Sequence, residues 1–201
     1  VIGVGLMYQM TGTLNIEDLG ERLLAVAETR TILIALAFLT IGIGLKAGLF
    51  PLHIWLPNAY CFAPSVVTSF LAATATKVAI YALLRVYFTV FGIKTIESLP
   101  VSELLLAMGL IAIVLMSTVA IYQNDAKRLL AYSSIAQIGY MVIGVSMLTV
   151  NGLTATTIHL FNHALMKAVL FLALAAIFYR INSVNIKDMA GLGKAMPFSM
   201  A

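Results

Sequence analysis

The chain has 201 residues, of which 62% are hydrophobic and 10% charged, and its formal net charge is +4. A soluble globular domain carries roughly 25% charged residues, so this composition excludes a soluble protein with a large core and predicts an all-α, polytopic membrane protein. The lysines and arginines are dispersed rather than gathered on one polar face, and nucleic acid is therefore not an expected partner.

The two ends of the sequence are apolar and lack the features of a processed terminus. The chain begins with Val1, without the basic start or the small-residue cleavage site of a signal peptide. Its last residues, up to Ala201, resemble the opening of another span. We therefore expect a fragment cut at both ends, with a helix stub over residues 1–10. Residues 11–30 follow as a polar connector that has room for a short amphipathic surface helix and contains the acids Glu17, Asp18, Glu21 and Glu28.

Five long apolar segments follow the connector. Each is long enough to cross a hydrocarbon core of about 30 Å as a helix of about 20 residues. We expect residues 1–201 to be a fragment of a single proton-conducting transmembrane domain, with the richer of its two sets of basic loops on the cytoplasmic side. The predicted spans are 31–50, 64–91, 103–123, 128–149 and 153–180.

Residues 51–64, between the first two spans, contain three prolines. Such a density of prolines excludes one continuous regular helix. Non-helical backbone at membrane depth is tolerated only inside protein or around a water-filled cavity. We therefore expect a broken helix, a segment that bends back, or an interfacial loop, and the aromatic rings of Trp55 and Tyr60 suit the boundary between water and lipid.

Basic residues lie inside the apolar segments, whereas every acid lies in a connector or at a span end. His159, His163 and Lys167 recur every four residues, so on a helix they share one stripe about 12 Å long. Lys46 and Lys77 lie within the first two spans. A charged lysine at mid-membrane costs about 2.5–3.5 kcal/mol, and we therefore expect these side chains to face a hydrated interior.

These basic side chains can handle protons. A lysine that has lost its hydration can gain and lose a proton near neutral pH, and histidine titrates there already. Because the buried charge has one sign, its acidic partners must come from outside the chain. Simpler interpretations stay open, since a lysine can extend its amine to the headgroups and an intramembrane histidine can merely join two helices. The predicted proton-translocation residues are Lys46, Lys77, His159, His163 and Lys167.

Other site chemistry has little support in the sequence. His159 and His163 have the spacing of two zinc ligands, but the zinc-protease pattern needs a glutamate directly after the first histidine, and Leu160 stands there. We therefore expect no metal site, and without a quinone, flavin or iron–sulfur signature we expect no cofactor. An enzymatic activity is left open, with ion transport favoured. The polar residues expected to join helices are Ser117, Thr118, Ser133, Ser134 and Gln137.

Three stretches of the chain resemble the antiporter-like subunits shared by complex I and the Mrp-type cation/proton antiporters. They are residues 44–59 together with 63–68, residues 124–140 and residues 159–172. A fourth stretch, 77–86, is most similar to the D-type subunit of the Mrp antiporters. The resemblance implies a subunit of about fourteen helices with two inverted five-helix repeats and discontinuous helices at its channel.

The same resemblance implies roles for individual residues. Lys46 would be the central lysine of the first discontinuous helix, paired with a glutamate upstream of the chain, and Lys77 would be its partner on the next helix. His159, His163 and Lys167 would carry protons along the membrane midplane.

The function that we predict is a proton-translocating, antiporter-like membrane subunit with Na⁺/H⁺ exchange of the Mrp type. One alternative is a proton-pumping subunit of a complex I-like or membrane-bound hydrogenase respiratory complex. Another is a structural helix bundle that transports nothing. The expected partners are other integral membrane subunits, with H⁺ and Na⁺ as the transported ions, in the inner membrane of a bacterium.

Overall fold

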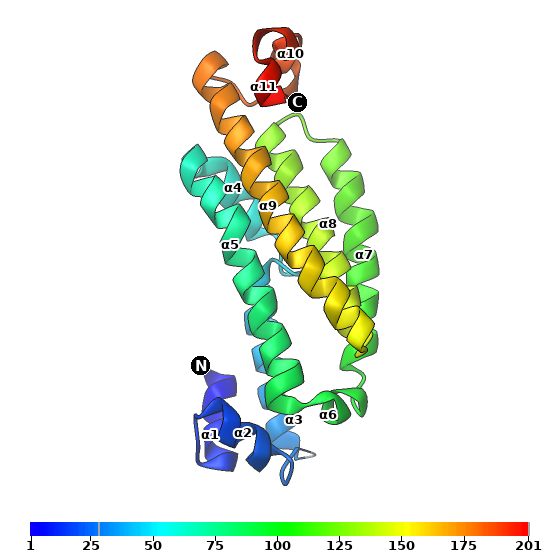
Figure 1. Ribbon diagram of the computed structural model, residues 1–201. Coiled ribbons are helices and arrows are strands. Elements are labelled where there is room, and N and C mark those ends of the chain that lie inside the picture. The colour runs from blue at the N-terminus through cyan, green and yellow to red at the C-terminus, as the bar shows by residue number, and fades with distance from the viewer. Residues whose placement is uncertain (28, 201) are drawn as a thin grey trace.

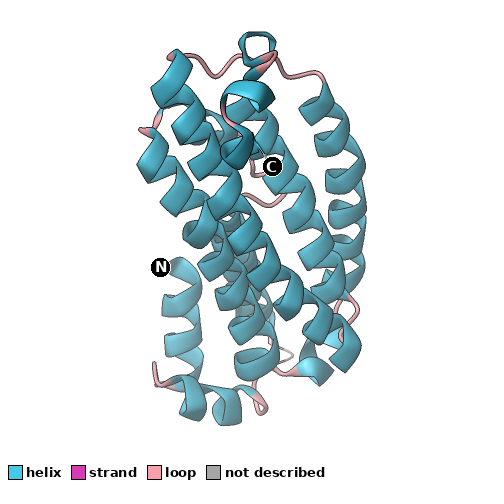
Figure 2. Ribbon diagram, turned by 45° about the horizontal axis from the view of Figure 1, so that its top comes forward, coloured by secondary structure: helices cyan, strands magenta, loops and turns pink. Residues whose placement is uncertain are grey.

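The computed structural model describes residues 1–27 and 29–200, so Glu28 of the predicted connector and Ala201 lie outside the described residues. Within these ranges the chain folds into helices without a β-strand (Figure 2). Asp125 and Asn185 form one isolated bridge between two loops. The predicted all-α architecture is therefore confirmed.

Five of the described helical segments are long and apolar enough to cross a membrane. Their ends differ from the predicted spans by at most three residues, because the length of each apolar run determines where a span can begin and end. Figure 1 shows them as one bundle, in which α9 crosses obliquely over its neighbours. The segments are α3 (Arg30–Ala47), α5 with its extension η1 (Ser65–Phe91), α7 (Val101–Ile121), α8 (Ala126–Ser146) and α9 (Val150–Ile181).

Short helices lie at both ends of the bundle (Figure 1). The predicted stub and the helix expected in the connector are α1 and α2, and α6 joins η1 to α7. Two short helices and a 3-10 turn follow α9 at the opposite end. Their bounds are α1 (Ile2–Thr11), α2 (Ile16–Leu23), α6 (Ile93–Glu97), η2 (Ile186–Met189), α10 (Leu192–Ala195) and α11 (Pro197–Met200).

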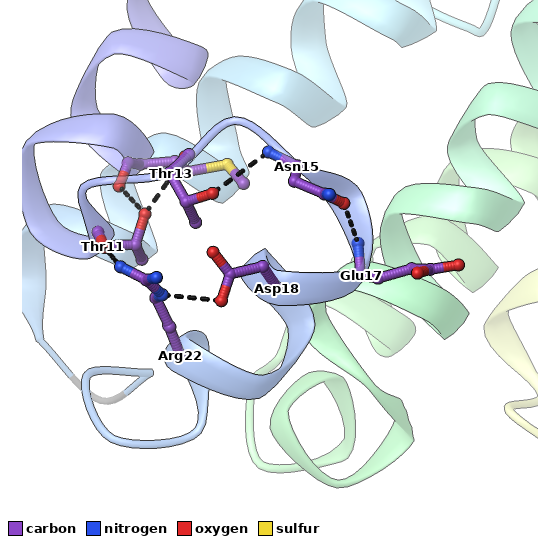
Figure 3. Close-up of polar contacts among 7 residues, drawn as sticks. Thr11, Thr13, Asn15, Glu17, Asp18 and Arg22 are labelled. Atoms are coloured by element: carbon purple, nitrogen blue, oxygen red, sulfur yellow. Dashed lines mark hydrogen bonds and ion pairs between the residues drawn. The ribbon is translucent and has the colours of Figure 1, made fainter.

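The connector between α1 and α2 is held by local polar contacts (Figure 3). The side chain of Asn15 accepts a hydrogen bond from the backbone N–H of Glu17 and so caps the start of α2. One turn further, Nε of Arg22 lies 2.7 Å from Oδ1 of Asp18, and Nη1 of Arg22 donates to the carbonyl of Thr11 at 3.0 Å. These contacts fix the turn that joins the two helices.

Of the three arrangements expected for residues 51–64, the structure shows the broken helix. Helix α3 ends at Ala47, and Gly48 follows with φ +74°, a left-handed conformation that favours glycine. The N–H of Leu49 donates to the carbonyl of Gly44 at 2.9 Å, and the N–H of Gly48 donates to that of Leu45 at 3.2 Å. This arrangement is a Schellman motif, which satisfies carbonyls left free where a helix stops.

The second half of the broken helix is α4 (Trp55–Phe62), which packs on α5 and α8. The indole N–H of Trp55 donates to the carbonyl of Leu45 at 2.9 Å, so it links the two halves across the break. The expectation that Tyr60 lies at the water–lipid boundary is wrong. Its ring is buried and meets Phe171 edge to face, with the ring centroids 5.5 Å apart.

The end of α5 has a form that the sequence did not indicate. From Arg85 to Phe91 the helix continues as a π-helix, η1. Within η1 the hydroxyl of Tyr87 is hydrogen-bonded to that of Thr40 on α3, at 2.8 Å. This bond gives the buried phenol a partner and ties α3 to the end of α5.

Candidate functional site

The candidate site lies where two hydrophobic cores meet. One core contains Ala79 and Ile80 of α5, and the other contains Ala72 of the same helix. Lys77 lies on α5 between these two groups. It is 4% exposed, and its ammonium group donates to the carbonyl of Ala72. Lys77 of α5, together with His159, His163 and Lys167 of α9, forms a basic layer between the two apolar parts of the bundle.

Helix α9 passes the same boundary and supplies the other bases. Leu160 packs against the first core and Phe171 belongs to the second, with His163 and Lys167 between them. His163 is 1% exposed and Lys167 is 2% exposed. The four-residue spacing therefore does direct one stripe of α9 towards the interior, as the helical repeat requires.

Two oxygen atoms of α8 hold the amine of Lys167. Its Nζ donates to the carbonyl of Leu130 at 2.9 Å and to the hydroxyl of Ser133 at 3.1 Å. Ser133 was expected only to join helices, and nothing in its sequence context indicated that it contacts a buried lysine. Both acceptors are neutral, so the ammonium group is hydrogen-bonded without being neutralised by an acid.

The two histidines stack on one another along α9. Their ring centroids lie 6.0 Å apart and their planes differ by 5°. Neither ring nitrogen of His163 has a hydrogen-bond partner among the described residues, and the same holds for Nε2 of His159. Buried polar atoms of this kind are rare in proteins and call for an explanation. Neutral imidazole has one nitrogen that accepts and one that donates, which suits the relay of a proton.

The side chains of the layer interact electrostatically across the contact between α5 and α9. Helices α5 and α9 pack on one another, so Lys77 lies on one side of this contact and His159, His163 and Lys167 on the other, and these groups repel one another when they are protonated. Among residues 1–27 and 29–200 the one ion pair joins Asp18 to Arg22 in the connector. The layer is therefore a group of mutually repelling bases without an acid paired to any of them in the described part of the chain.

His159 is the member of the layer that borders an open space. A cavity of about 480 Å³ lies between α8 and α9, and its lining includes Gln137, Tyr140, Thr156 and His159. The ring of Tyr140 meets that of His159 edge to face, with centroids 6.3 Å apart. The half-buried imidazole of His159 thus borders the same space as three polar side chains.

Lys46 stands apart from this layer. It occupies the last turn of α3, directly before the break, and its side chain is exposed in the described structure. The structure therefore brings together four of the five predicted residues, Lys77, His159, His163 and Lys167, and leaves Lys46 on the outside of the bundle. A basic residue in the last turn also interacts favourably with the dipole of the helix.

Known proteins resemble the chain along its whole length. It is 40% identical to NADH-quinone oxidoreductase subunit N of Desulforudis audaxviator, with 100% of this chain and 40% of that protein covered. It is 32% identical to the D-type subunit of a Na⁺/H⁺ antiporter from Alkalihalophilus pseudofirmus, with 98% of this chain and 40% of that protein covered. Among solved structures, a chain of the Mrp complex from Dietzia sp. DQ12-45-1b has a TM-score of 0.89 and 31% identity, over 98% of this chain and 36% of that one.

These relatives are subunits of multisubunit membrane complexes, and the chain spans about two fifths of their length. The transmembrane family of the NADH:quinone oxidoreductases and Mrp antiporters matches residues 1–201. The five apolar helices agree with this match. The chain is therefore an integral, multi-pass membrane protein that belongs to the antiporter-like family of NADH:quinone oxidoreductase and Mrp antiporter subunits.

Proposed function

We propose that the chain is a proton-conducting part of an antiporter-like subunit and that the basic layer passes the protons. The observation behind this proposal is that Lys77, His163 and Lys167 are buried between two hydrophobic cores without an acid paired to them among the described residues. Apolar residues would fill the same positions at lower cost. Groups that bind and release protons give a reason to keep these bases.

Mutual repulsion in this layer would drive the transfer. Lys77 and Lys167 are both buried on helices that pack together, and because like charges repel, a proton that arrives on one of them favours release from the other. His163 lies between His159 and Lys167 along α9 and stacks on the ring of His159, so its imidazole can receive a proton from one side and donate one to the other. His159 then exchanges protons with the cavity between α8 and α9.

Lys46 would control this transfer from outside the layer. Its side chain is exposed at the end of α3, and the family resemblance implies a glutamate as its partner. We infer that an acidic group from outside the described residues faces Lys46. A change in this ion pair would change the proton affinity of Lys77 and then that of His159, His163 and Lys167 on α9.

Sodium exchange is the first candidate for the coupled process. The similarity to the D-type Na⁺/H⁺ antiporter subunit of Alkalihalophilus pseudofirmus supports it. Proton pumping within a respiratory complex is the second candidate, supported by the 40% identity to an NADH-quinone oxidoreductase subunit. In both cases the chain would work with other integral membrane subunits, in the cell membrane of a bacterium.

The test uses the complete subunit in its native complex, reconstituted into vesicles with a pH-sensitive dye inside. Lys46→Ala and Lys167→Ala should each abolish proton movement while leaving assembly intact, whereas Lys94→Ala, at an exposed position in α6, should transport at the native rate. Proton movement that follows an imposed Na⁺ gradient would identify exchange, and movement that requires electron transfer would identify the respiratory role. Native rates in both Lys46→Ala and Lys167→Ala would refute the proposal.

A further inference from the structure

The first two turns of α8 touch two separate parts of the molecule. On one side Lys127 and Arg128 contact α4, the second half of the broken helix. On the other side the carbonyl of Leu130 and the hydroxyl of Ser133 accept hydrogen bonds from Lys167. A single short piece of helix therefore holds both the segment beyond the break and one of the buried amines.

Lys127 caps the end of α4. Its side chain is only 7% exposed, and its Nζ donates to the carbonyl of Ala63, the C-cap residue of α4, at 3.2 Å. The hydroxyl oxygen of Thr68 lies 3.2 Å from the same carbonyl oxygen. A cation is favoured at this end of a helix, where the last carbonyls have no partner within the helix and the dipole is negative.

Arg128 adds a second tie to α4. Its Nη2 donates to Oδ1 of Asn58 at 3.2 Å. Its backbone N–H donates to the side chain of Asp125, the N-cap of α8, at 2.9 Å. The thiol of Cys61, also on α4, lies 3.8 Å from the same carboxylate oxygen. The contacts of Lys127 and Arg128 with α4 and the N-cap contact of Asp125 therefore all lie at the start of α8.

The start of α8 is itself held by the loop after α9. The N–H of Ala126 donates to the carbonyl of Val184, and the N–H of Ile186 donates to the carbonyl of Asn124, each at 2.9 Å. These bonds pair the two loops on either side of the bridge between Asp125 and Asn185. The first turns of α8 are therefore constrained at both their backbone and their side chains, as a stiff connecting element would be.

We propose that the first two turns of α8 couple the broken helix mechanically to Lys167, with Lys127 as the positioning residue. The ammonium of Lys127 and the guanidinium of Arg128 hold α4 to the backbone that presents Leu130 and Ser133 to Lys167. A displacement of α4 then moves these two acceptors. Because a hydrogen bond is lost near 3.6 Å, a shift of about 0.5 Å would break the 3.1 Å contact with Ser133, and a shift of about 0.7 Å would also break the 2.9 Å contact with Leu130.

This coupling rests on the proposed function, but its structural part can be measured separately. The experiment uses the complete subunit in its complex with Lys127→Met, which keeps the length of the side chain and removes its charge. Hydrogen exchange of the α4 amides should become faster, because the helix loses its charged cap. Proton transport should fall by roughly tenfold or more, the effect of losing a hydrogen bond from a charged group.

Three further variants separate positioning from other roles. Lys127→Arg should restore both exchange and transport to within about twofold of the native values, since it keeps the charged donor. Asn58→Asp, added to Lys127→Met, would give Arg128 an ionised acceptor in place of an amide and should recover at least about twofold in transport. Lys187→Met, at an exposed position in η2, should change neither quantity.

Each combination of transport and exchange results supports or overturns the coupling between α4 and Lys167. Slower transport with faster exchange of α4, and recovery of both by Asn58→Asp, supports the coupling. Slower transport with native exchange and no recovery would mean that Lys127 acts directly on protons, and native transport with faster exchange would mean a cap without coupling; either result overturns the inference. A native complex that moves no protons at all would refute the proposed function instead, while the exchange data would still show whether Lys127 holds α4.

Discussion

In the connector between α1 and α2, Asp18 and Arg22 form an ion pair at 2.7 Å in contact with solvent (Figure 3). In the layer between α5 and α9, Lys77 and Lys167 are buried, and among residues 1–27 and 29–200 they donate only to neutral oxygens. The exposed charges of Asp18 and Arg22 are therefore paired with each other, although water could hydrate them. The buried amines of Lys77 and Lys167 have no acidic partner among the described residues, although little water can reach them. Stability alone favours the reverse arrangement, because burial of an uncompensated charge is costly.

The difference indicates what each region contributes. An exposed ion pair is worth little, since solvent screens it and both side chains lose freedom. A buried amine that is neutral for part of the time avoids the full cost of burial, because it can give up its proton. The connector is thus organised to hold a turn, and the basic layer is organised so that protons enter and leave it. Substitutions that separate stability from transport test this distinction.

The largest effect is expected from Lys77→Met in the complete subunit. Proton transport in reconstituted vesicles should fall by about a hundredfold or more, the typical scale for loss of a proton-transferring group. The midpoint of thermal unfolding should stay the same or rise, because an uncompensated buried charge is replaced by an apolar chain of similar length. Measurement of both quantities on one preparation distinguishes loss of chemistry from loss of fold.

Lys94→Met provides the matched control, since Lys94 is exposed on α6. Its transport and its unfolding midpoint should both remain at the native values. If Lys77→Met unfolded at a clearly lower temperature than this control, Lys77 would be a structural residue. The contrast between the basic layer and the connector would then be lost.

The backbone at the helix break should matter more for stability than the buried bases do. Gly48 has φ +74°, and a Cβ atom there would lie 2.6 Å from Cδ1 of Leu56. Gly48→Ala should therefore reduce the free energy of unfolding by about 1–3 kcal/mol, from the left-handed conformation and the contact together. Chemical denaturation in detergent measures this change. Gly42→Ala, at a helical position where nothing lies within 4 Å of the added atom, should not destabilise the protein.

The helices could be predicted because each depends on a local pattern. Apolar length indicated the five spans, and the four-residue spacing placed His163 and Lys167 on one inward stripe. The prolines of residues 51–64 indicated a break, which the structure places between Ala47 and Trp55. These signals need no knowledge of the neighbouring helices. They describe how a segment folds rather than what it contacts.

What could not be predicted depends on contacts between segments that lie far apart in the chain. The depth of Lys46 in its span gave no indication of its direction, and the structure places its side chain outside the bundle. An aromatic ring in a proline-rich connector is typical of the water–lipid boundary, and the sequence did not indicate that Tyr60 packs against Phe171 of α9. The apolar and aromatic run of η1 is compatible with both an α-helix and a π-helix, so composition could not distinguish them.

A smaller effect, of opposite sign, is expected at His163. Both of its ring nitrogens are buried without a partner in the described structure, and leaving such groups unsatisfied costs about 1–3 kcal/mol. His163→Leu should therefore raise the unfolding free energy by up to about 1 kcal/mol, once the imperfect fit of the new side chain is included. Transport should be lost at the same time. A variant that became less stable would show that the imidazole has partners in the assembled protein that hold it in place.

The smallest effect is expected at the connector. The hydrogen bond from Arg22 holds the pKa of Asp18 below its ordinary value. A carboxyl group whose pKa is lower in the folded state stabilises the protein above its unfolded pKa, and this contribution disappears as the pH falls through the folded pKa. Asp18→Asn should therefore lower the unfolding midpoint slightly at pH 7, with the difference shrinking from about pH 4 downward. High salt at pH 7 should shrink it as well, because solvent ions screen an exposed pair. A difference that persisted in acid and in high salt would show that Asp18 acts through packing or capping rather than through its charge, and the connector would no longer serve as the paired counterpart of the basic layer.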